Sequence, residues 1–139
     1  MYDEHYVPTL LDVYQGEKSV NRTNMELEIH DTAGDENLSM NRAIQYQNAD
    51  VFMICVPVAN KEENTELAPY RSVDYQERIW FWKNEILSVH RDRPIFLVLT
   101  KSDLLEDSEV EEPVTKEKLV SECNDHGFQG VMVTSSQQW

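Results

Sequence analysis

Three short apolar stretches rich in β-branched residues set the strongest limit on how this chain folds. They are residues 51–58, 95–99 and 131–133. Residues 74–90 and 115–126 separate them and have the apolar spacing or the end signals of helices. Buried strands that alternate with helices predict an α/β fold with a mainly parallel sheet. We expect the first stretch to be buried on both faces, as central parallel strands are, and the other two to be buried as well.

The chain before residue 51 has a different pattern. Residues 12–20 alternate weakly, and residues 25–30 alternate strictly between apolar and polar side chains, as a half-buried strand does. With the polar turn at residues 20–24 between them, they predict an antiparallel hairpin with a rather long loop. Residues 37–47 are expected to form a short helix.

Length and charge restrict the class of protein. The chain has 139 residues, enough for one domain over residues 1–139, and carries 12 Lys and Arg against 26 Asp and Glu, a net charge of -14. Such an acidic chain is poorly suited to nucleic acid or to an anionic membrane. No apolar run reaches the roughly 18 residues of a membrane span. The two cysteines, Cys55 and Cys123, are far apart in the sequence, which favours a reduced, cytoplasmic protein. The sequence has no Cys/His cluster, so we expect no zinc site.

Polar clusters follow three of the predicted strands. They are residues 31–34, 100–103 and 134–136. Ligands of parallel α/β sheets bind at the carboxyl ends of the strands, so these clusters predict one binding site.

Two of these clusters could bind a specific ligand, but each could also be an ordinary loop. Asp31 and Gly34 could hold a hydrated Mg²⁺ and a phosphate, or could form a simple turn. Lys101 and Asp103 could recognise guanine, because a carboxylate accepts from both guanine N–H groups, or could form a solvated loop.

The order and spacing of these motifs resemble the small GTPases of the Ras superfamily, most closely the Rho family. The resemblance rests on Tyr6-Val7-Pro8-Thr9 with Asp12 and Tyr14, on Asp31-Thr32-Ala33-Gly34, on Thr100-Lys101-Ser102-Asp103-Leu104 and on Thr134-Ser135-Ser136. It implies a three-layer α/β/α P-loop NTPase-like fold, mainly parallel, with one antiparallel edge strand. Switch I would lie near residues 5–14, switch II near 31–47, and an insertion near 60–74.

The resemblance also implies a function and a set of site residues. The chain would be a molecular switch in signal transduction that binds GTP or GDP with Mg²⁺. Its partners would be effectors, exchange factors and GTPase-activating proteins. The nucleotide would be held by Tyr2, Thr9, Asp31, Gly34, Thr100, Lys101, Asp103, Ser135 and Ser136, with Thr9 and Asp31 also binding the metal. Effectors would contact Tyr6, Val7, Pro8, Leu11, Asp12 and Tyr14.

Several features depart from the family pattern. The chain contains no G-x-x-x-x-G-K-[ST] phosphate loop. It starts after the family's first strand and stops before its last helix and prenylated tail, so we expect a fold incomplete at both ends and no direct membrane anchor. Loss of the first strand would leave strand edges unpaired or re-paired, and loss of the last helix would uncover one sheet face. Asp35, beside Gly34, stands where the family has the glutamine that orients the attacking water. The resemblance therefore does not decide whether the protein hydrolyses GTP, and we expect the chain by itself to be inactive.

Three hypotheses follow from these observations. The chain is a piece of a Rho-like GTPase with weak or no activity by itself. Alternatively, it is a nucleotide-free pseudo-GTPase that acts as a protein-interaction module. A third hypothesis is an unrelated acidic α/β binding domain.

Overall fold

The computed structural model describes residues 9–57, 74–103 and 126–136, together with residues 117, 120, 121 and 124. The chain divides into two compact units, residues 1–48 and residues 49–139, and each is described by itself. The predicted site residues Tyr2, Tyr6, Val7 and Pro8, and almost all of the predicted insertion at 60–74, lie outside the described residues. Within the part described, no helix is long and apolar enough to cross a lipid bilayer.

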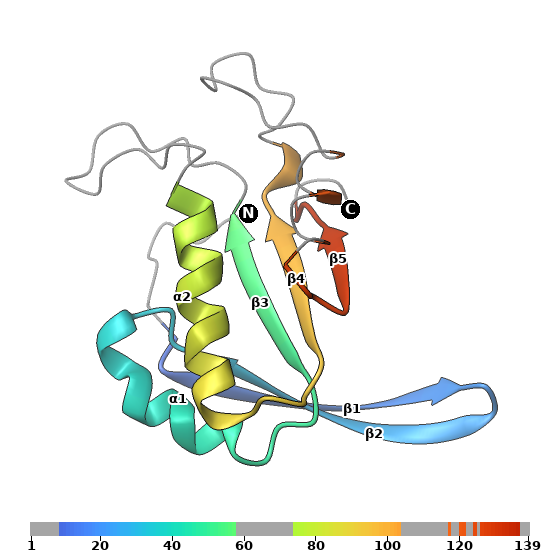
Figure 1. Cartoon of the computed structure of the whole chain (residues 1–139). Coiled ribbons are helices and arrows are strands. Elements are labelled where there is room, and N and C mark those ends of the chain that lie inside the picture. Colours follow the sequence, from blue (N-terminus) through green and yellow to red (C-terminus); the bar gives the residue numbers. More distant parts are fainter. Residues whose placement is uncertain are drawn as a thin grey trace. The chain divides into compact units, whose positions relative to one another are not determined.

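The first unit is a β-hairpin followed by a short helical segment (Figure 1). Strands β1 (Leu11–Val20) and β2 (Thr23–Thr32) pair antiparallel over their whole length. A 3₁₀ turn, η1 (Glu36–Leu38), then leads into helix α1 (Ser39–Tyr46). The predicted hairpin and short helix are therefore confirmed.

The hairpin turn is tighter than predicted. The ladder continues to Val20 and Thr23, so only Asn21 and Arg22 form the loop, with φ values of 50° and 66°. Two consecutive residues at positive φ are what a two-residue turn needs to match the twist of the strands. The expected long loop is wrong because Asn21 tolerates this conformation and lets the strands pair up to the turn.

The hairpin is also more exposed than its pattern suggested. Every residue of β2 before Thr32 is exposed, although residues 25–30 alternate like a half-buried strand. The hairpin forms a two-stranded sheet of its own, and α1 meets it at the base, where Leu11 and Thr32 pair. The alternating pattern therefore predicted the strand and its two faces correctly, but the apolar face is exposed rather than buried.

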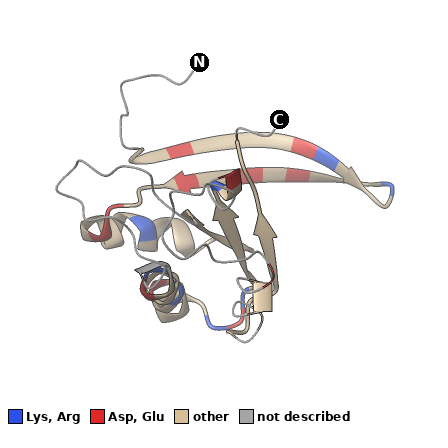
Figure 2. Cartoon of the chain, turned by 90° about the horizontal axis from the view of Figure 1, so that it is seen from above, with Lys and Arg blue, Asp and Glu red and all other residues tan. Residues whose placement is uncertain are grey.

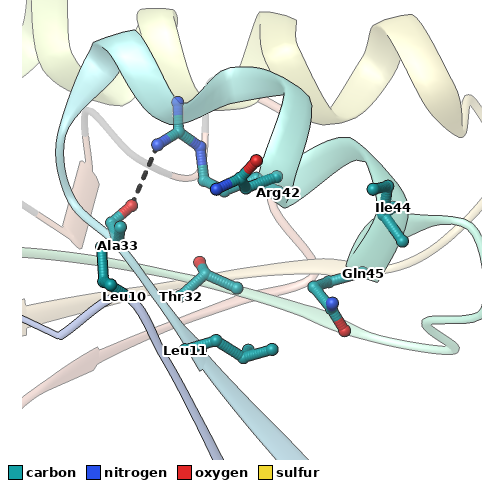
Figure 3. Close-up of a pocket in the computed structure, with 8 residues that line it drawn as sticks. Leu10, Leu11, Thr32, Ala33, Arg42, Ile44 and Gln45 are labelled. Carbon is teal, nitrogen blue, oxygen red and sulfur yellow. Dashed lines mark hydrogen bonds between the residues drawn. The ribbon is translucent and has the colours of Figure 1, made fainter.

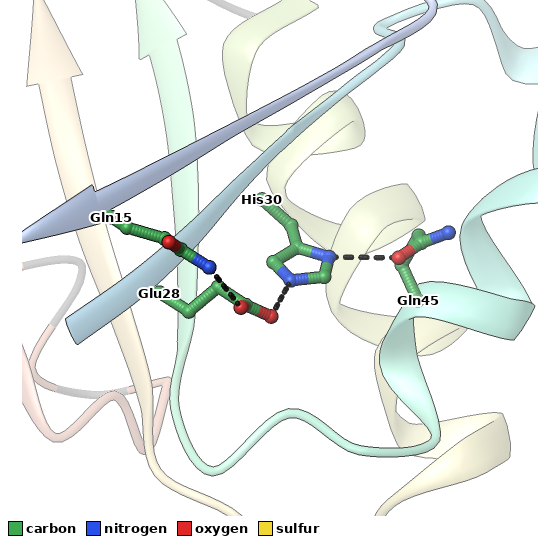
Figure 4. A network of polar contacts seen from close by, with 4 residues as sticks. All are labelled: Gln15, Glu28, His30 and Gln45. Carbon is green, nitrogen blue, oxygen red and sulfur yellow. Dashed lines mark hydrogen bonds and ion pairs between the residues drawn. The ribbon is translucent and has the colours of Figure 1, made fainter. Parts of the chain in front are cut away.

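A polar network joins the hairpin to α1 (Figure 4). His30 Nδ1 lies 2.7 Å from Gln45 Oε1, and His30 Nε2 lies 2.6 Å from Glu28 Oε1. Gln15 Nε2 donates to the other Glu28 oxygen at 3.1 Å. With Gln45 Oε1 and Glu28 Oε1 both accepting, the arrangement favours the protonated ring, which donates from both nitrogens. The hydrogen bonds to Glu28 and then Gln45 accordingly raise the pKa of His30, and the bond from His30 lowers the pKa of Glu28.

The described residues of the second unit form a three-stranded parallel sheet and a long helix (Figure 1). Its strands are β3 (Phe52–Pro57), β4 (Ile95–Thr100) and β5 (Gly130–Val133), in the order β3-β4-β5. Helix α2 (Asp74–Val89) follows β3 in the chain, and its Ile79 and Ile86 are buried. The three predicted strands, their parallel pairing and the helix at 74–90 are confirmed.

The burial of the strands differs from one to the next. In β4, Leu97 and Leu99 are completely buried and the intervening Val98 is nearly so, as expected. In β3, Phe52, Ile54 and Val56 are buried, but Met53 and Cys55 between them are exposed. The prediction that residues 51–58 are buried on both faces is wrong.

The exposed residues lie on one face of the sheet. Cys55 is paired with Val98, and Val98 with Met132, which is 45% exposed, so burial of β5 is also incomplete. Helix α2 packs against β3, and the alternate residues Phe52, Ile54 and Val56 take the buried face. The composition of β3 suits burial on both faces, but the structure buries only one.

Helix α2 is also fixed to the turn that precedes β5. Lys83 Nζ donates to the His126 carbonyl and lies 4.7 Å from the Phe128 ring centroid. The Trp80 ring meets the His126 ring edge-on at 5.0 Å. Burial lowers the pKa of Lys83. Gly127, with φ 70°, has the conformation expected of a helix-ending glycine, although most of the helix predicted before it lies outside the described residues.

The His30 network predicts a pH-dependent link between β2 and α1. Its stabilising effect is present below the ordinary His pKa of 6.5 and is lost as the pH rises through the raised pKa of His30. At the acid end, the effect is present above the ordinary Glu value of 4.5 and is lost as the pH falls through the lowered pKa of Glu28. An NMR titration of the His30 ring should give a pKa above 6.5, and Gln45→Ala should lower it. A His30 pKa at or below 6.5 would contradict this assignment.

Candidate functional site

The carboxyl ends of β4 and β5 bring two of the predicted polar clusters together. The Thr134 amide donates to the Leu99 carbonyl at 2.8 Å, and the Ser102 amide donates to the Thr134 carbonyl at 3.0 Å. Thr134 thus ties the end of β4 to the loop that follows it. Residues 100–103 and 134–136 form one continuous edge as a result.

At this edge the Asp103 carboxylate is held by Ser135. The buried Ser135 hydroxyl donates to Asp103 Oδ1 at 2.5 Å, although the two residues are 32 positions apart in the chain. Asp103 itself is partly buried. A carboxylate fixed in this way is pre-oriented, because the side-chain freedom that a ligand would otherwise remove has already been lost.

The backbone conformation of Lys101 makes this arrangement possible. Lys101 has φ 58°, a left-handed conformation that is uncommon for residues other than glycine. The sharp turn directs the chain from β4 into the short 3₁₀ segment that carries Ser102 and Asp103. The Lys101 side chain is exposed, as is Ser136, while Thr100 is partly buried at the end of β4.

The base of the hairpin gathers the predicted phosphate and metal residues of the first unit. The Ala33 amide donates to the Leu10 carbonyl at 3.2 Å, which extends the pairing of β1 and β2 by one residue. Thr9 and Gly34, which flank this pair, therefore leave the same end of the hairpin as Asp31. Asp31 is exposed, and Thr9 is partly buried.

Neither close packing nor backbone conformation requires a glycine at position 34. A Cβ added there would meet nothing within 4 Å, and the backbone φ is not in the left-handed region. A glycine without these internal reasons is suited to close approach by a ligand.

Asp35 has a local structural role. Its Oδ1 accepts hydrogen bonds from the Asn37 amide at 2.9 Å and from Asn37 Nδ2 at 3.0 Å, so it is the N-cap of η1. The structure directs this carboxylate into its own helical turn.

Arg42 holds the loop between the hairpin and α1. Its guanidinium is almost completely buried and donates to the Ala33 carbonyl at 3.0 Å, to the Asp35 carbonyl and to the Glu36 carbonyl at 3.3 Å. One charged side chain thereby satisfies carbonyl groups of three residues in the loop that contains Gly34. Sequence reasoning did not single out Arg42, because no local pattern separates it from an ordinary helix residue.

A small hollow lies between the hairpin base and α1 (Figure 3). It has a volume of about 210 Å³ and is lined by Leu10, Leu11, Thr32, Ala33, Asn41, Arg42, Ile44 and Gln45. It is smaller than the pockets that hold cofactor-sized ligands. Leu11, predicted to contact effectors, lines this hollow, while the exposed Asp12 and Tyr14 belong to β1.

The donor chemistry at the hairpin base suits Mg²⁺ but does not form a metal site by itself. The described residues contain no group of three or more His, Cys, Asp or Glu that could hold a metal ion. Thr9 and Asp31 offer one hydroxyl and one carboxylate. Mg²⁺ is commonly bound in this way, with the remaining positions taken by phosphate oxygens and water.

The fold and the strand-end loops define a mixed α/β protein, in which a parallel three-stranded sheet and an antiparallel strand pair carry polar loops. A Ras family sequence profile matches residues 1–136, and the chain therefore belongs to the Ras family. Membership in this family implies the P-loop NTPase fold.

Its relatives are distant and Rho-related. Rho-related protein racC of Entamoeba histolytica is 29% identical over 116 residues, covering 84% of this chain and 54% of the relative. GTP-binding protein rho1 of Schizosaccharomyces pombe is 30% identical, with coverage of 83% and 52%. Human Rho-related GTP-binding protein RhoF is 29% identical, with coverage of 78% and 46%. The chain spans about half the length of these relatives.

The role of Arg42 predicts a local loss of stability in Arg42→Met. The substitution keeps apolar bulk but removes the donors to three buried or partly buried carbonyls, at a cost of about 2–4 kcal/mol. Exchange of the Leu38 amide, which donates to the Asp35 carbonyl at 3.1 Å, should become about 30- to 1,000-fold faster. Arg91→Met, at an exposed position, is the matched control and should leave Leu38 unchanged. Equal exchange in the two variants would refute this role.

Proposed function

We propose that this chain is the switch and guanine-recognition part of a Rho-like molecular switch that acts in cytoplasmic signal transduction, with weak or no activity by itself. The observation that carries the proposal is the Asp103 carboxylate, fixed by Ser135 at the adjoining ends of β4 and β5. Ligands of parallel sheets bind at this edge. The carboxylate can accept from the ring N–H and the exocyclic amine of guanine, a pair that adenine does not present.

The other base contacts belong to the same edge. The stem of Lys101 would lie over the base, Thr100 would support the loop, and the Ser136 amide would lie near the base oxygen. Tyr2, outside the described residues, would pack against the base. The left-handed backbone of Lys101 supports the proposal, since uncommon conformations occur often at ligand sites.

The phosphate contacts would come from the hairpin base. Thr9 and Asp31 would hold Mg²⁺, which would neutralise phosphate charge, and the Gly34 amide would donate to the γ-phosphate. The open space around Gly34 supports this role. In the proposed fold, the hairpin is the antiparallel edge of a mainly parallel sheet in a three-layer α/β/α domain.

The 139 residues provide only part of a tight phosphate site. They contain no G-x-x-x-x-G-K-[ST] loop. Such a loop makes about four charge-assisted contacts, each worth roughly 1.5–3 kcal/mol, so its absence weakens binding by about 6–12 kcal/mol. We therefore expect weak nucleotide binding. Effectors, exchange factors and GTPase-activating proteins are proposed partners through Tyr6, Val7, Pro8, Leu11, Asp12 and Tyr14.

A nucleotide-free pseudo-GTPase is the second candidate function. The observation that favours it is the Asp35 side chain, which caps η1 and stands at the position of the water-orienting glutamine. A carboxylate there is short and anionic, and repels a phosphate. In this alternative the hairpin surface would still bind proteins.

Base selectivity tests the proposal. In NMR titrations at millimolar nucleotide, the chain should bind GDP at least about tenfold more tightly than ADP, as expected of a bidentate contact. Asp103→Asn replaces an acceptor by a donor and should favour xanthosine diphosphate over GDP. Asp92→Asn, an exposed change before the start of β4, is the control and should retain the GDP preference. A folded chain with no guanine preference would refute the proposal in favour of the pseudo-GTPase.

The proposal also predicts no measurable catalysis. With GTP and Mg²⁺, phosphate release by the chain should be no faster than in buffer, because the phosphate-loop lysine is absent and Asp35 cannot orient water as glutamine does. The measurement is multiple-turnover phosphate release over a range of chain concentrations. A rate that rises in proportion to the chain would contradict this expectation.

A further inference from the structure

The Gly34 amide lies in a loop whose neighbouring groups are held by hydrogen bonds. Gly34 is exposed, and within the described part of the chain no hydrogen bond takes up its N–H. The residue before it is fixed, since Ala33 is 4% exposed and its own amide donates to the Leu10 carbonyl at 3.2 Å. The direction of the Gly34 N–H therefore depends on the peptide group that joins Ala33 to Gly34.

Arg42 holds this peptide group by its oxygen. Arg42 Nη1 donates to the Ala33 carbonyl at 3.0 Å, as Figure 3 shows. The carbonyl and the Gly34 N–H belong to one planar peptide unit, and no peptide bond of the described residues is cis. In a trans peptide these two groups point in opposite directions. Arg42 therefore directs the Gly34 N–H away from its own side chain.

Two further contacts hold the guanidinium itself in place. Nη1 also donates to the Asp35 carbonyl, and Nη2 donates to the Glu36 carbonyl at 3.3 Å. The guanidinium presents its donors in a rigid planar fork, so it holds the carbonyl groups of the loop in one arrangement. Rotation of the Ala33–Gly34 peptide would break its bond to Arg42. Because Arg42 is 2% exposed, water is poorly placed to replace that bond.

We propose that Arg42 is a positioning residue that orients the Gly34 amide toward the terminal phosphate of a guanosine triphosphate. This inference rests on the proposed function, in which the Gly34 N–H donates to the γ-phosphate. Arg42 does not touch the nucleotide in this role and acts through the Ala33–Gly34 peptide. Because only the triphosphate presents a γ-phosphate to this donor, Arg42 sets how strongly the chain distinguishes GTP from GDP.

The charge of the chain makes an oriented donor necessary. The net charge is -14, and on the hairpin the acidic side chains outnumber the basic ones (Figure 2). This field repels each additional phosphate charge, so it disfavours the triphosphate. A donor that is already oriented opposes the repulsion at full strength, whereas one that must first be ordered loses part of its binding free energy.

Nucleotide titrations of the full 139-residue chain test the proposal. The probes are a non-hydrolysable GTP analogue and GDP, each with excess Mg²⁺, followed by NMR. The wild type should bind the triphosphate about tenfold more tightly than GDP, the effect of one charge-assisted hydrogen bond. Arg42→Lys keeps the charge but offers one nitrogen in place of the fork, and should reduce this ratio to about threefold or less. Arg42→Met should reduce it at least as much.

The direction of the Gly34 amide is measurable without any nucleotide. Residual dipolar couplings report the orientation of each N–H bond in the free chain. In the wild type, the Gly34 coupling should fit the rigid frame of the hairpin. In Arg42→Lys it should be averaged toward zero, while the Ala33 coupling stays unchanged because its amide remains paired with Leu10. A purely stabilising role of Arg42 would leave the Gly34 coupling of the folded variant at its wild-type value.

Gln45→Ala is the matched control. It removes the hydrogen bond to His30 and so loosens α1 from the hairpin, but it leaves the Arg42 contacts intact, so both readouts should stay as in the wild type. Full triphosphate preference or an unchanged Gly34 coupling in Arg42→Lys, or equal losses in Gln45→Ala, would overturn the proposal.

The preference for GDP over ADP separates this inference from the proposed function. The Arg42 variants should keep it, because Asp103 belongs to the other unit. A wild type that prefers guanine but not the triphosphate would overturn the role of Arg42 alone. A wild type without guanine preference would refute the proposed function and, with it, this inference.

Discussion

The parallel pairing of β4 with both of its neighbours is the constraint on which the second unit depends. Leu97 and Leu99 are completely buried, and a slip of β4 by one residue would turn both side chains to the opposite face of the sheet. This register places the carboxyl ends of β4 and β5 side by side at the same edge of the sheet. Asp103 and Ser135 then meet although they are far apart in the chain. The candidate guanine contact thus depends on core packing in β4, at Leu97 and Leu99, which precede Asp103 by six and four residues.

The first unit is organised by polar groups rather than by a core. Ala33 and Tyr46 are its buried apolar residues among those described, and the hairpin above them is exposed. Arg42 stabilises this unit in place of a larger apolar core, because its buried guanidinium donates hydrogen bonds to three carbonyl groups of the loop after β2. His30 adds a second attachment between hairpin and helix. A segment fixed in this way can change conformation when a few contacts change, as a switch requires.

Both units leave apolar sheet surface exposed. In the second unit, Met53, Cys55 and Met132 are exposed on the face that also carries the buried Val98. In the first unit, Tyr14, Leu27 and Ile29 are exposed on one face of the hairpin. The chain spans about half the length of its relatives.

The sequence by itself determined the elements and the polar clusters, because both depend on local patterns. The alternation at residues 25–30, the apolar run of β4 and the helical spacing of Ile79 and Ile86 each predicted the right element. Motif order identified the family. Burial could not be predicted this way: β3 has the composition of a fully buried strand, yet only one face is covered, since burial depends on which elements lie above it.

Tertiary structure alone decided the contacts within the candidate site. The cap formed by Asp35, the buried role of Arg42 and the left-handed turn at Lys101 have no sequence pattern that separates them from ordinary loop residues. The hydrogen bond from Ser135 to Asp103 joins two loops that only the sheet brings together. A sequence records which groups are available, whereas their partners follow from the long-range pairing of strands, which no local pattern contains.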